Sequence, residues 1–101
     1  MAAMSTTIRV VAHLVALPEK VEELRSVLIA LVEPTRREDG CIHYELLQNQ
    51  EEPTDFAFIE EWQSEAFLTA HLASDHVQDV DASLDRLLAS SPDIRLYHLL
   101  A

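Results

Sequence analysis

The amino-acid sequence predicts an α+β fold in the order β-α-β-β-α-β, with a four-stranded antiparallel sheet and its helices on one face. Three observations support this prediction. Four short segments are rich in β-branched and aromatic residues, two longer ones repeat apolar residues at helical spacing, and a polar turn joins the two middle β segments. The length of 101 residues suits one domain with one hydrophobic core.

The first predicted strand is Ile8 to Leu17, which is apolar on both phases of a two-residue period, as in a strand covered on both faces. Pro18 and the acids after it are typical of a helix start. The apolar residues of this helix repeat at three-to-four spacing: Val21, Leu24, Leu28 and Leu31. We expect Pro34 to kink the helix or to end its regular part at about Glu33, and Gly40 to stop the last turn.

The two middle strands are predicted at Cys41 to Gln48 and at Asp55 to Trp62. The six polar or turn-forming residues between them favour an antiparallel hairpin.

The second helical region follows Ser64, a typical N-cap residue, and continues to Leu88. We expect this region to break near Ser74. A loop is predicted at Ser90, Ser91 and Pro92, and the closing strand is predicted after it at Ile94 to Leu100. The whole order matches the split arrangement of a ferredoxin-like fold.

Such a sheet has a second face that its own helices cannot cover. On the first strand Val11, His13 and Val15 share this face, opposite Ile8, Val10, Ala12 and Leu14. The economical explanation is a homodimer that buries the two open faces against each other. The same face takes titratable side chains from three strands, so the dimer is expected to respond to pH: His13, His43, Glu45 and Glu61.

Composition limits the partners and the compartment. The chain has 18 acidic and 7 basic residues and a net charge of −11, so we expect neither nucleic acid nor an anionic membrane surface as a partner. The single cysteine, Cys41, forms no internal disulfide, and residues 1–7 lack the pattern of a signal peptide. The expected location is the cytoplasm. With Gly40 as its one glycine, the chain has no glycine-rich phosphate loop.

Two segments resemble a known family. The runs EPTRREDGCIHYELL (Glu33 to Leu47) and FAFIEEWQSEAFLTAHLASDHV (Phe56 to Val77) are similar to the antibiotic biosynthesis monooxygenase (ABM) superfamily of dimeric α+β barrel proteins. The most specific matches are two ordered sets of side chains: Arg36, Glu38, Gly40, Cys41 and Tyr44, then Glu60, Trp62, His71 and His76. The resemblance implies an ABM-like domain over residues 8–101, preceded by a short extension at 1–7, and a homodimeric barrel with a pocket between sheet and helices.

Members of this superfamily include cofactor-independent oxygenases of aromatic polyketides or quinols, haem-degrading oxygenases and enzymes of a phosphorylated signalling sugar. In the haem-degrading members the functional residues are an asparagine on the first strand and an axial histidine on a later helix. Those positions fall near Ala12 and Asp81 here, which disfavours haem. We therefore expect no cofactor.

His71 and His76 are the candidate bases, with a structural role such as capping as the alternative. Five residues apart, they lie about 140° apart on a continuous helix and do not share a metal ion unless the helix breaks at Ser74. No metal site is predicted.

Phe56, Phe58, Glu60 and Trp62 alternate along one strand and so point to one face of the sheet. Trp62, Phe58 and Tyr44 are candidate walls of a substrate pocket, with core packing as the alternative. Glu60 is a candidate acid–base group: on an apolar face it either pairs with a donor such as a histidine or Arg36, the preferred interpretation, or has a raised pKa.

Together with these residues, the resemblance implies a cofactor-independent monooxygenase of a small aromatic or quinol-like substrate, because a base and a dry aromatic pocket suffice to form an anion that reacts with dioxygen. Two alternatives remain open from the sequence. One is a dimer that binds a small molecule without turnover, and the other is an isomerase-type enzyme acting on a small hydroxyketone.

Overall fold

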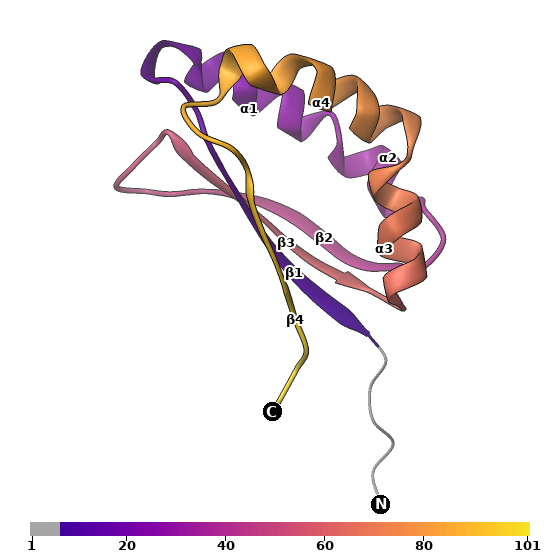
Figure 1. Ribbon diagram of the computed structural model, residues 1–101. Coiled ribbons are helices and arrows are strands. Elements are labelled where there is room, and N and C mark those ends of the chain that lie inside the picture. Colours follow the sequence, from indigo (N-terminus) through magenta and orange to yellow (C-terminus); the bar gives the residue numbers. More distant parts are fainter. Residues whose placement is uncertain (1–6) are drawn as a thin grey trace, which may run out of the picture.

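In a computed structural model, which describes residues 7–101, the chain forms a four-stranded antiparallel sheet in the order β2-β3-β1-β4. The strands are β1 (Ile8–Val15), β2 (Cys41–Gln48), β3 (Asp55–Trp62) and β4 (Asp93–Tyr97). The helices lie together on one face of this sheet (Figure 1). The predicted fold class and element order are confirmed. Apart from Thr7, the predicted N-terminal extension lies outside the described residues.

The helical segments come in two groups. The first connection holds a short 3-10 turn (Pro18–Lys20), α1 (Val21–Ile29) and α2 (Val32–Arg36). The second holds α3 (Glu65–Leu72) and α4 (Asp75–Leu87), so the expected break near Ser74 is confirmed. Ser64 occupies the N-cap position of α3, although its side chain makes no capping hydrogen bond.

The first helix breaks earlier than predicted. It ends at Ile29, four residues before Glu33, and Pro34 lies inside the first turn of α2. A proline ring clashes with the carbonyl group four residues before it, and for Pro34 that residue is Ala30, the C-cap of α1. The proline therefore interrupts the helix upstream of itself and starts a new one.

Two strands are shorter than predicted. The Leu17 N–H donates to the carbonyl of Leu87 at 2.9 Å instead of continuing a strand ladder, so β1 ends at Val15. At the other edge, Tyr97 pairs with Arg9 near the start of β1, and β4 ends there.

The middle strands have the predicted bounds, with one irregularity. The register shifts between Cys41 and His43, so Ile42 forms a bulge. Two-residue alternation would place Ile42 on the buried face with Tyr44, but the bulge leaves Ile42 48% exposed.

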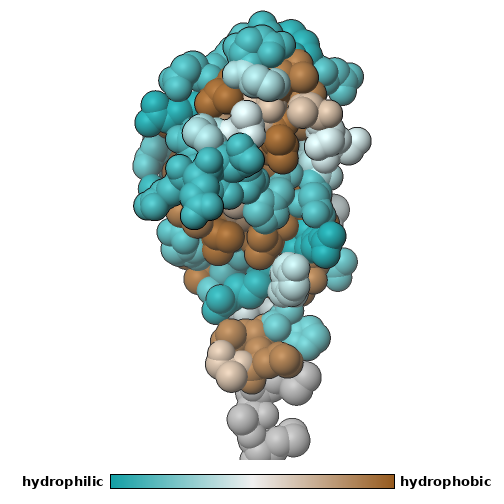
Figure 2. All heavy atoms as spheres, turned by 90° about the vertical axis from the view of Figure 1, so that its left-hand side faces the viewer, coloured by the Kyte–Doolittle hydropathy of each residue, from teal (hydrophilic) through white to brown (hydrophobic). Residues whose placement is uncertain are grey.

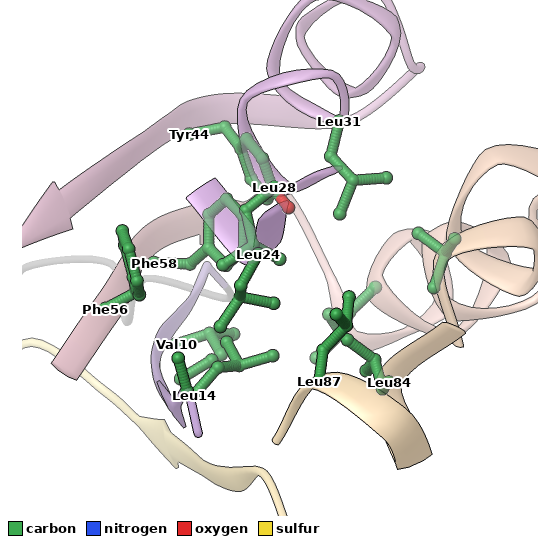
Figure 3. Close-up of a cluster of buried hydrophobic side chains, with 14 of the residues drawn as sticks. Val10, Leu14, Leu24, Leu28, Leu31, Tyr44, Phe56, Phe58, Leu84 and Leu87 are labelled. Carbon is green, nitrogen blue, oxygen red and sulfur yellow. The ribbon is translucent and has the colours of Figure 1, made fainter. Parts of the chain in front are cut away.

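The hydrophobic core lies between the sheet and the helices. Leu24 and Leu28 of α1 and Leu87 of α4 are fully buried, and Figure 3 shows them directed toward the aromatic and aliphatic side chains of the sheet. Because α1 and α4 each contribute a leucine stripe, this core fixes the distance between the helices and the buried face of β3.

The opposite face of the sheet has no helix over it in the described chain (Figure 1). Hydrophobic surface lies among hydrophilic side chains on the side of the molecule that Figure 2 presents. All five residues of β4 are exposed. Within residues 7–101, none of the helices is long and apolar enough to cross a membrane.

Gly40 fixes the connection between α2 and β2. Its φ of +82° is in the left-handed region that favours glycine, and a Cβ there would lie 2.2 Å from Cγ of Phe67 on α3. The Gly40 carbonyl also accepts a 2.8 Å hydrogen bond from the N–H of Gln63. The segment that carries Glu38 is thereby held against α3 at Phe67. Phe67 lies one helical turn before His71.

Candidate functional site

The buried face of β3 carries the predicted aromatic and acidic side chains. Phe58, Glu60 and Trp62 are 4%, 5% and 0% exposed, which confirms that they point to one face. The indole N–H of Trp62 donates a 2.8 Å hydrogen bond to Oε1 of Glu60. Residues two apart on a strand lie side by side on the same face, so this contact follows directly from the spacing.

Glu60 has a perturbed acidity. Burial raises its pKa to about 7, the hydrogen bond from Trp62 opposes that rise, and the negative charge of Glu38 adds to it. The sequence favoured a histidine or Arg36 as the partner of Glu60. The expected pairing with a donor is present, but the donor is the Trp62 indole, and Nε of Arg36 instead donates to the main-chain carbonyl of Tyr44 at 3.0 Å.

A cavity of about 120 Å³ lies between the sheet and the helices, and Glu60 is part of its lining. Apart from Glu60 and Asp81, the lining is apolar and comes mainly from β1, β3, β4, α1 and α4, with Phe58 as its aromatic wall. Trp62 and Tyr44 lie outside this lining. Glu60 therefore presents to this largely apolar cavity a carboxyl group whose pKa is about 7.

His71 and His76 meet at a carboxylate that had no role in the sequence-based prediction. Oε2 of Glu38 lies 2.7 Å from Nδ1 of His71 and 2.7 Å from Nε2 of His76. A carboxylate only accepts hydrogen bonds, so both imidazoles donate to the same oxygen. The break between α3 and α4 permits this convergence, and the Ser74 hydroxyl, which donates to the His71 carbonyl at 2.6 Å, stabilises the break.

His71 is the buried member of this cluster, at 3% exposed. Its ring lies 4.7 Å from that of Trp62 and 5.5 Å from that of Tyr44, measured between centroids. Burial lowers the pKa of His71, and the Glu38 carboxylate partly opposes this. His71 is thus a neutral imidazole packed behind the indole that holds Glu60.

Tyr44 stacks on Phe58 with ring centroids 4.8 Å apart. Burial raises the pKa of its hydroxyl well above the ordinary value, and the charge of Glu60 acts in the same direction. Tyr44 is therefore a neutral phenol that supports the aromatic wall from behind.

The six candidate residues thus form one continuous cluster with two faces. Glu60 and Phe58 line the cavity, whereas His71 and His76 face Glu38. Trp62 joins the two, through a hydrogen bond on one side and a ring contact on the other. The sequence signal that could have located the histidine pair was the break at Ser74, since it removes the 140° separation of a continuous helix.

Comparison with known proteins places the chain in a family. The family model described as "Antibiotic biosynthesis monooxygenase" matches residues 7–83. This chain belongs to the ABM family.

Curated relatives of this chain have names without a defined substrate. "Putative monooxygenase YcnE" of Bacillus subtilis is 32% identical over 82% of this chain and 87% of its own length. "Putative monooxygenase Rv0793" of Mycobacterium tuberculosis is 31% identical over 84% and 83%. An uncharacterized Synechocystis protein, sll1783, is 30% identical over 81% of this chain, which spans 56% of that relative's length.

A solved structure is similar to this protein over nearly the whole chain. PA3566 from Pseudomonas aeruginosa superposes with a TM-score of 0.91 at 33% identity, covering 99% of this chain and 100% of that one. Together with the names of the relatives, the ABM family supports a monooxygenase-like function in general terms.

The family resemblance implies that the strand asparagine and the axial histidine of haem-degrading members fall near Ala12 and Asp81. Both line the cavity. An alanine methyl group offers no hydrogen bond, and an aspartate is not a nitrogen ligand. The cavity therefore lacks these two haem-related side chains where the family resemblance would put them.

Proposed function

We propose that the protein is a cofactor-independent monooxygenase that oxidises a small aromatic, quinol-type substrate with dioxygen, and that Glu60 is its general base. The observation that carries this proposal is the placement of the Glu60 carboxyl group in the lining of an otherwise largely apolar cavity. Neither His71 nor His76 is in that lining, so the histidines become positioning residues in this proposal rather than the base.

Glu60 suits the base role in two ways. A general base works best when its pKa is near the operating pH, and the pKa of Glu60 is about 7. The Trp62 N–H binds Oε1, which leaves Oε2 to take a proton. The fully buried indole also fixes the direction of the carboxyl group.

The size of the cavity supports a single aromatic ring as the substrate. An apolar cavity of about 150 Å³ accommodates benzene in a well-studied engineered protein. A cavity of about 120 Å³ that opens to the surface is close to this size, so a monocyclic hydroquinone fits the proposal better than a tricyclic anthrone.

In the proposed reaction Glu60 removes a phenolic proton, and the resulting phenolate gives electrons to dioxygen. A bond forms between a ring carbon and oxygen, giving a hydroperoxide. Glu60 returns its proton when the hydroperoxide forms, and then removes the hydrogen of that ring carbon as a proton while the O–O bond breaks. The departing hydroxide takes this proton from Glu60 and leaves as water. Hydroquinone plus O₂ yields hydroxyquinone plus water, so one oxygen atom enters the product and the substrate supplies all four electrons.

Oxygen consumption in the presence of chelator tests the proposal. We expect the wild-type protein to accelerate oxygen uptake with monocyclic hydroquinones above their own autoxidation, and Glu60→Gln to lose about 10²-fold or more, the usual contribution of a general base. Glu22→Gln is the matched control, because this carboxylate is exposed on α1. Equal uptake in wild type and Glu60→Gln would refute the role of Glu60.

The test also separates the two alternatives. An isomerase would use the same base without oxygen and would exchange protons of a small hydroxyketone with solvent deuterium. A binding dimer would do neither. Uptake absent with every hydroquinone, together with deuterium exchange that requires Glu60, would replace the proposal by the isomerase.

We also propose that two copies associate through the open face of the sheet. The support is a set of apolar side chains on that face with no helix over them: Leu47 and Tyr97 are about half exposed, and Val11, Val15 and Ile59 are partly exposed. Both edge strands, β2 and β4, have an unpaired side within the described chain. Sedimentation should give twice the mass of the chain.

A further inference from the structure

We propose that Glu38, His71 and His76 form a three-ligand binding site for a divalent first-row transition metal ion. This site is separate from the cavity, because none of the three residues is part of the cavity lining. The proposed oxygen chemistry at Glu60 does not depend on it. The 140° separation that disfavours a shared ion holds only for a continuous helix, and the chain between α3 and α4 is not helical.

The geometry of the donor atoms is close to that of a metal site. One ligand atom from each residue lies within 4.8 Å of the other two, and Oε2 of Glu38 is 2.7 Å from both nitrogens. Ligands about 2.0–2.1 Å from a tetrahedral ion are about 3.3 Å apart. Binding therefore requires the Glu38 oxygen to withdraw from the imidazoles by about 0.6 Å. It also requires the two nitrogens, which lie within 4.8 Å of each other, to approach to about 3.3 Å, and the partly exposed His76 side chain has the freedom to rotate for this.

The donor types select the class of ion. Two imidazole nitrogens and one carboxylate oxygen are typical of zinc and of non-haem ferrous sites that keep open positions for water or a ligand. A neutral imidazole carries its proton on either nitrogen, so Nδ1 of His71 and Nε2 of His76 each present a lone pair once the proton lies on the other nitrogen. An ion replaces the two hydrogen bonds that now hold the three side chains together.

An ion can reach the three side chains from solvent, and neighbouring residues hold them in place. The His71 side chain is 4% exposed and the Glu38 side chain 16%, while that of His76 is 27% exposed and provides the entry from solvent. The Ser74 hydroxyl lies 3.3 Å from Nε2 of His76 and donates to the His71 carbonyl, so it fixes the break from which both histidines project. Gly40 anchors the Glu38 segment on α3.

The protein contains its own reporter for this site. Trp62 is the single tryptophan, and its ring centroid lies 4.7 Å from that of His71. A paramagnetic ion such as Ni²⁺ or Co²⁺ bound to His71 should quench the Trp62 fluorescence, whereas Zn²⁺ should compete without strong quenching. The readout therefore requires no enzymatic activity.

The experiment is a titration of chelator-treated, tag-free protein with Ni²⁺, followed by competition with Zn²⁺. We expect saturable quenching at one ion per chain. His76→Gln and Glu38→Gln should each weaken binding at least about tenfold, since each removes a ligand. His13→Gln is the matched control, because His13 also lies beside a carboxylate, 3.0 Å from Asp55, but on the exposed face of the sheet.

The visible spectrum of the Co²⁺ protein gives a second, independent readout of nitrogen and oxygen ligands, and circular dichroism of each variant checks that it is folded. Quenching that does not saturate, or that is as strong in folded His76→Gln and Glu38→Gln as in wild type, would overturn the proposal. Quenching lost equally in His13→Gln would assign the ion to the sheet face and would also overturn it.

Discussion

Replacement of Glu60 by glutamine should make the protein more stable at pH 8 and change its stability little at pH 4. Glutamine has nearly the same shape as glutamate, and its amide oxygen can still accept the hydrogen bond from Trp62. What the substitution removes is the cost of ionising a carboxyl group that is 5% exposed. The two proteins therefore differ in a single titrating group.

The magnitude follows from the pKa of Glu60. The pKa rises from an ordinary value of 4.5 to about 7 in the folded chain, so the folded state holds this proton more tightly than the unfolded state. The contribution of Glu60 to stability is therefore highest below pH 4.5 and falls as the pH rises toward 7. A shift of about 2.5 units corresponds to about 3 kcal/mol at pH 8 and to about 1 kcal/mol at pH 5.

The assay is urea unfolding followed by Trp62 fluorescence and circular dichroism, at one fixed protein concentration because association also stabilises the fold. The free energy of unfolding of Glu60→Gln minus that of wild type should increase by about 2.5 kcal/mol between pH 5 and pH 8. Glu22→Gln, on the surface of α1, should show no such increase. A difference for Glu60→Gln that is the same at both pH values would refute the raised pKa.

Three further predictions concern the surroundings of the site. Trp62→Phe removes the N–H that lowers the pKa of Glu60, so the rise of activity with pH, expected near pH 7 in wild type, should move to higher pH in initial-rate profiles. Gly40→Ala places a methyl group against Phe67 at a φ of +82° and should cost at least about 2 kcal/mol in urea unfolding; an unchanged midpoint would contradict the packing described. The open face carries His13 beside Asp55 and His43 beside Glu45, so sedimentation at pH 5 and pH 8 should give different dimer constants, and equal constants would count against a pH-sensitive interface.

The bounds of the hairpin strands could be predicted to the residue because both segments are rich in β-branched and aromatic residues and the turn between them is polar. The first helix could not, because the sequence locates Pro34 but not which side of it the helix will break. The structure breaks it at Ala30, four residues before the proline, where the ring and the carbonyl would clash. The bulge at Ile42 has no local signal either, since it depends on how β2 pairs with β3.

The candidate site was predictable where it lies on one strand. Alternation along β3 places Phe58, Glu60 and Trp62 on the buried face, and the structure confirms it. The contacts of Glu38 were not predictable, because the residue is 33 and 38 positions from His71 and His76 in the sequence. Their meeting depends on the Gly40 turn packing on Phe67, a contact between distant segments that no local pattern reveals.

The most direct test of the central claim is the fate of dioxygen. A monocyclic hydroquinone should be incubated with the protein and chelator under ¹⁸O₂, and the product should be analysed by mass spectrometry while hydrogen peroxide is assayed in parallel. We predict one ¹⁸O atom in the product, no peroxide, and loss of both labelling and excess oxygen uptake in Glu60→Gln. An unlabelled product, or labelling that persists at the wild-type rate in Glu60→Gln, would contradict a monooxygenase with Glu60 as its base.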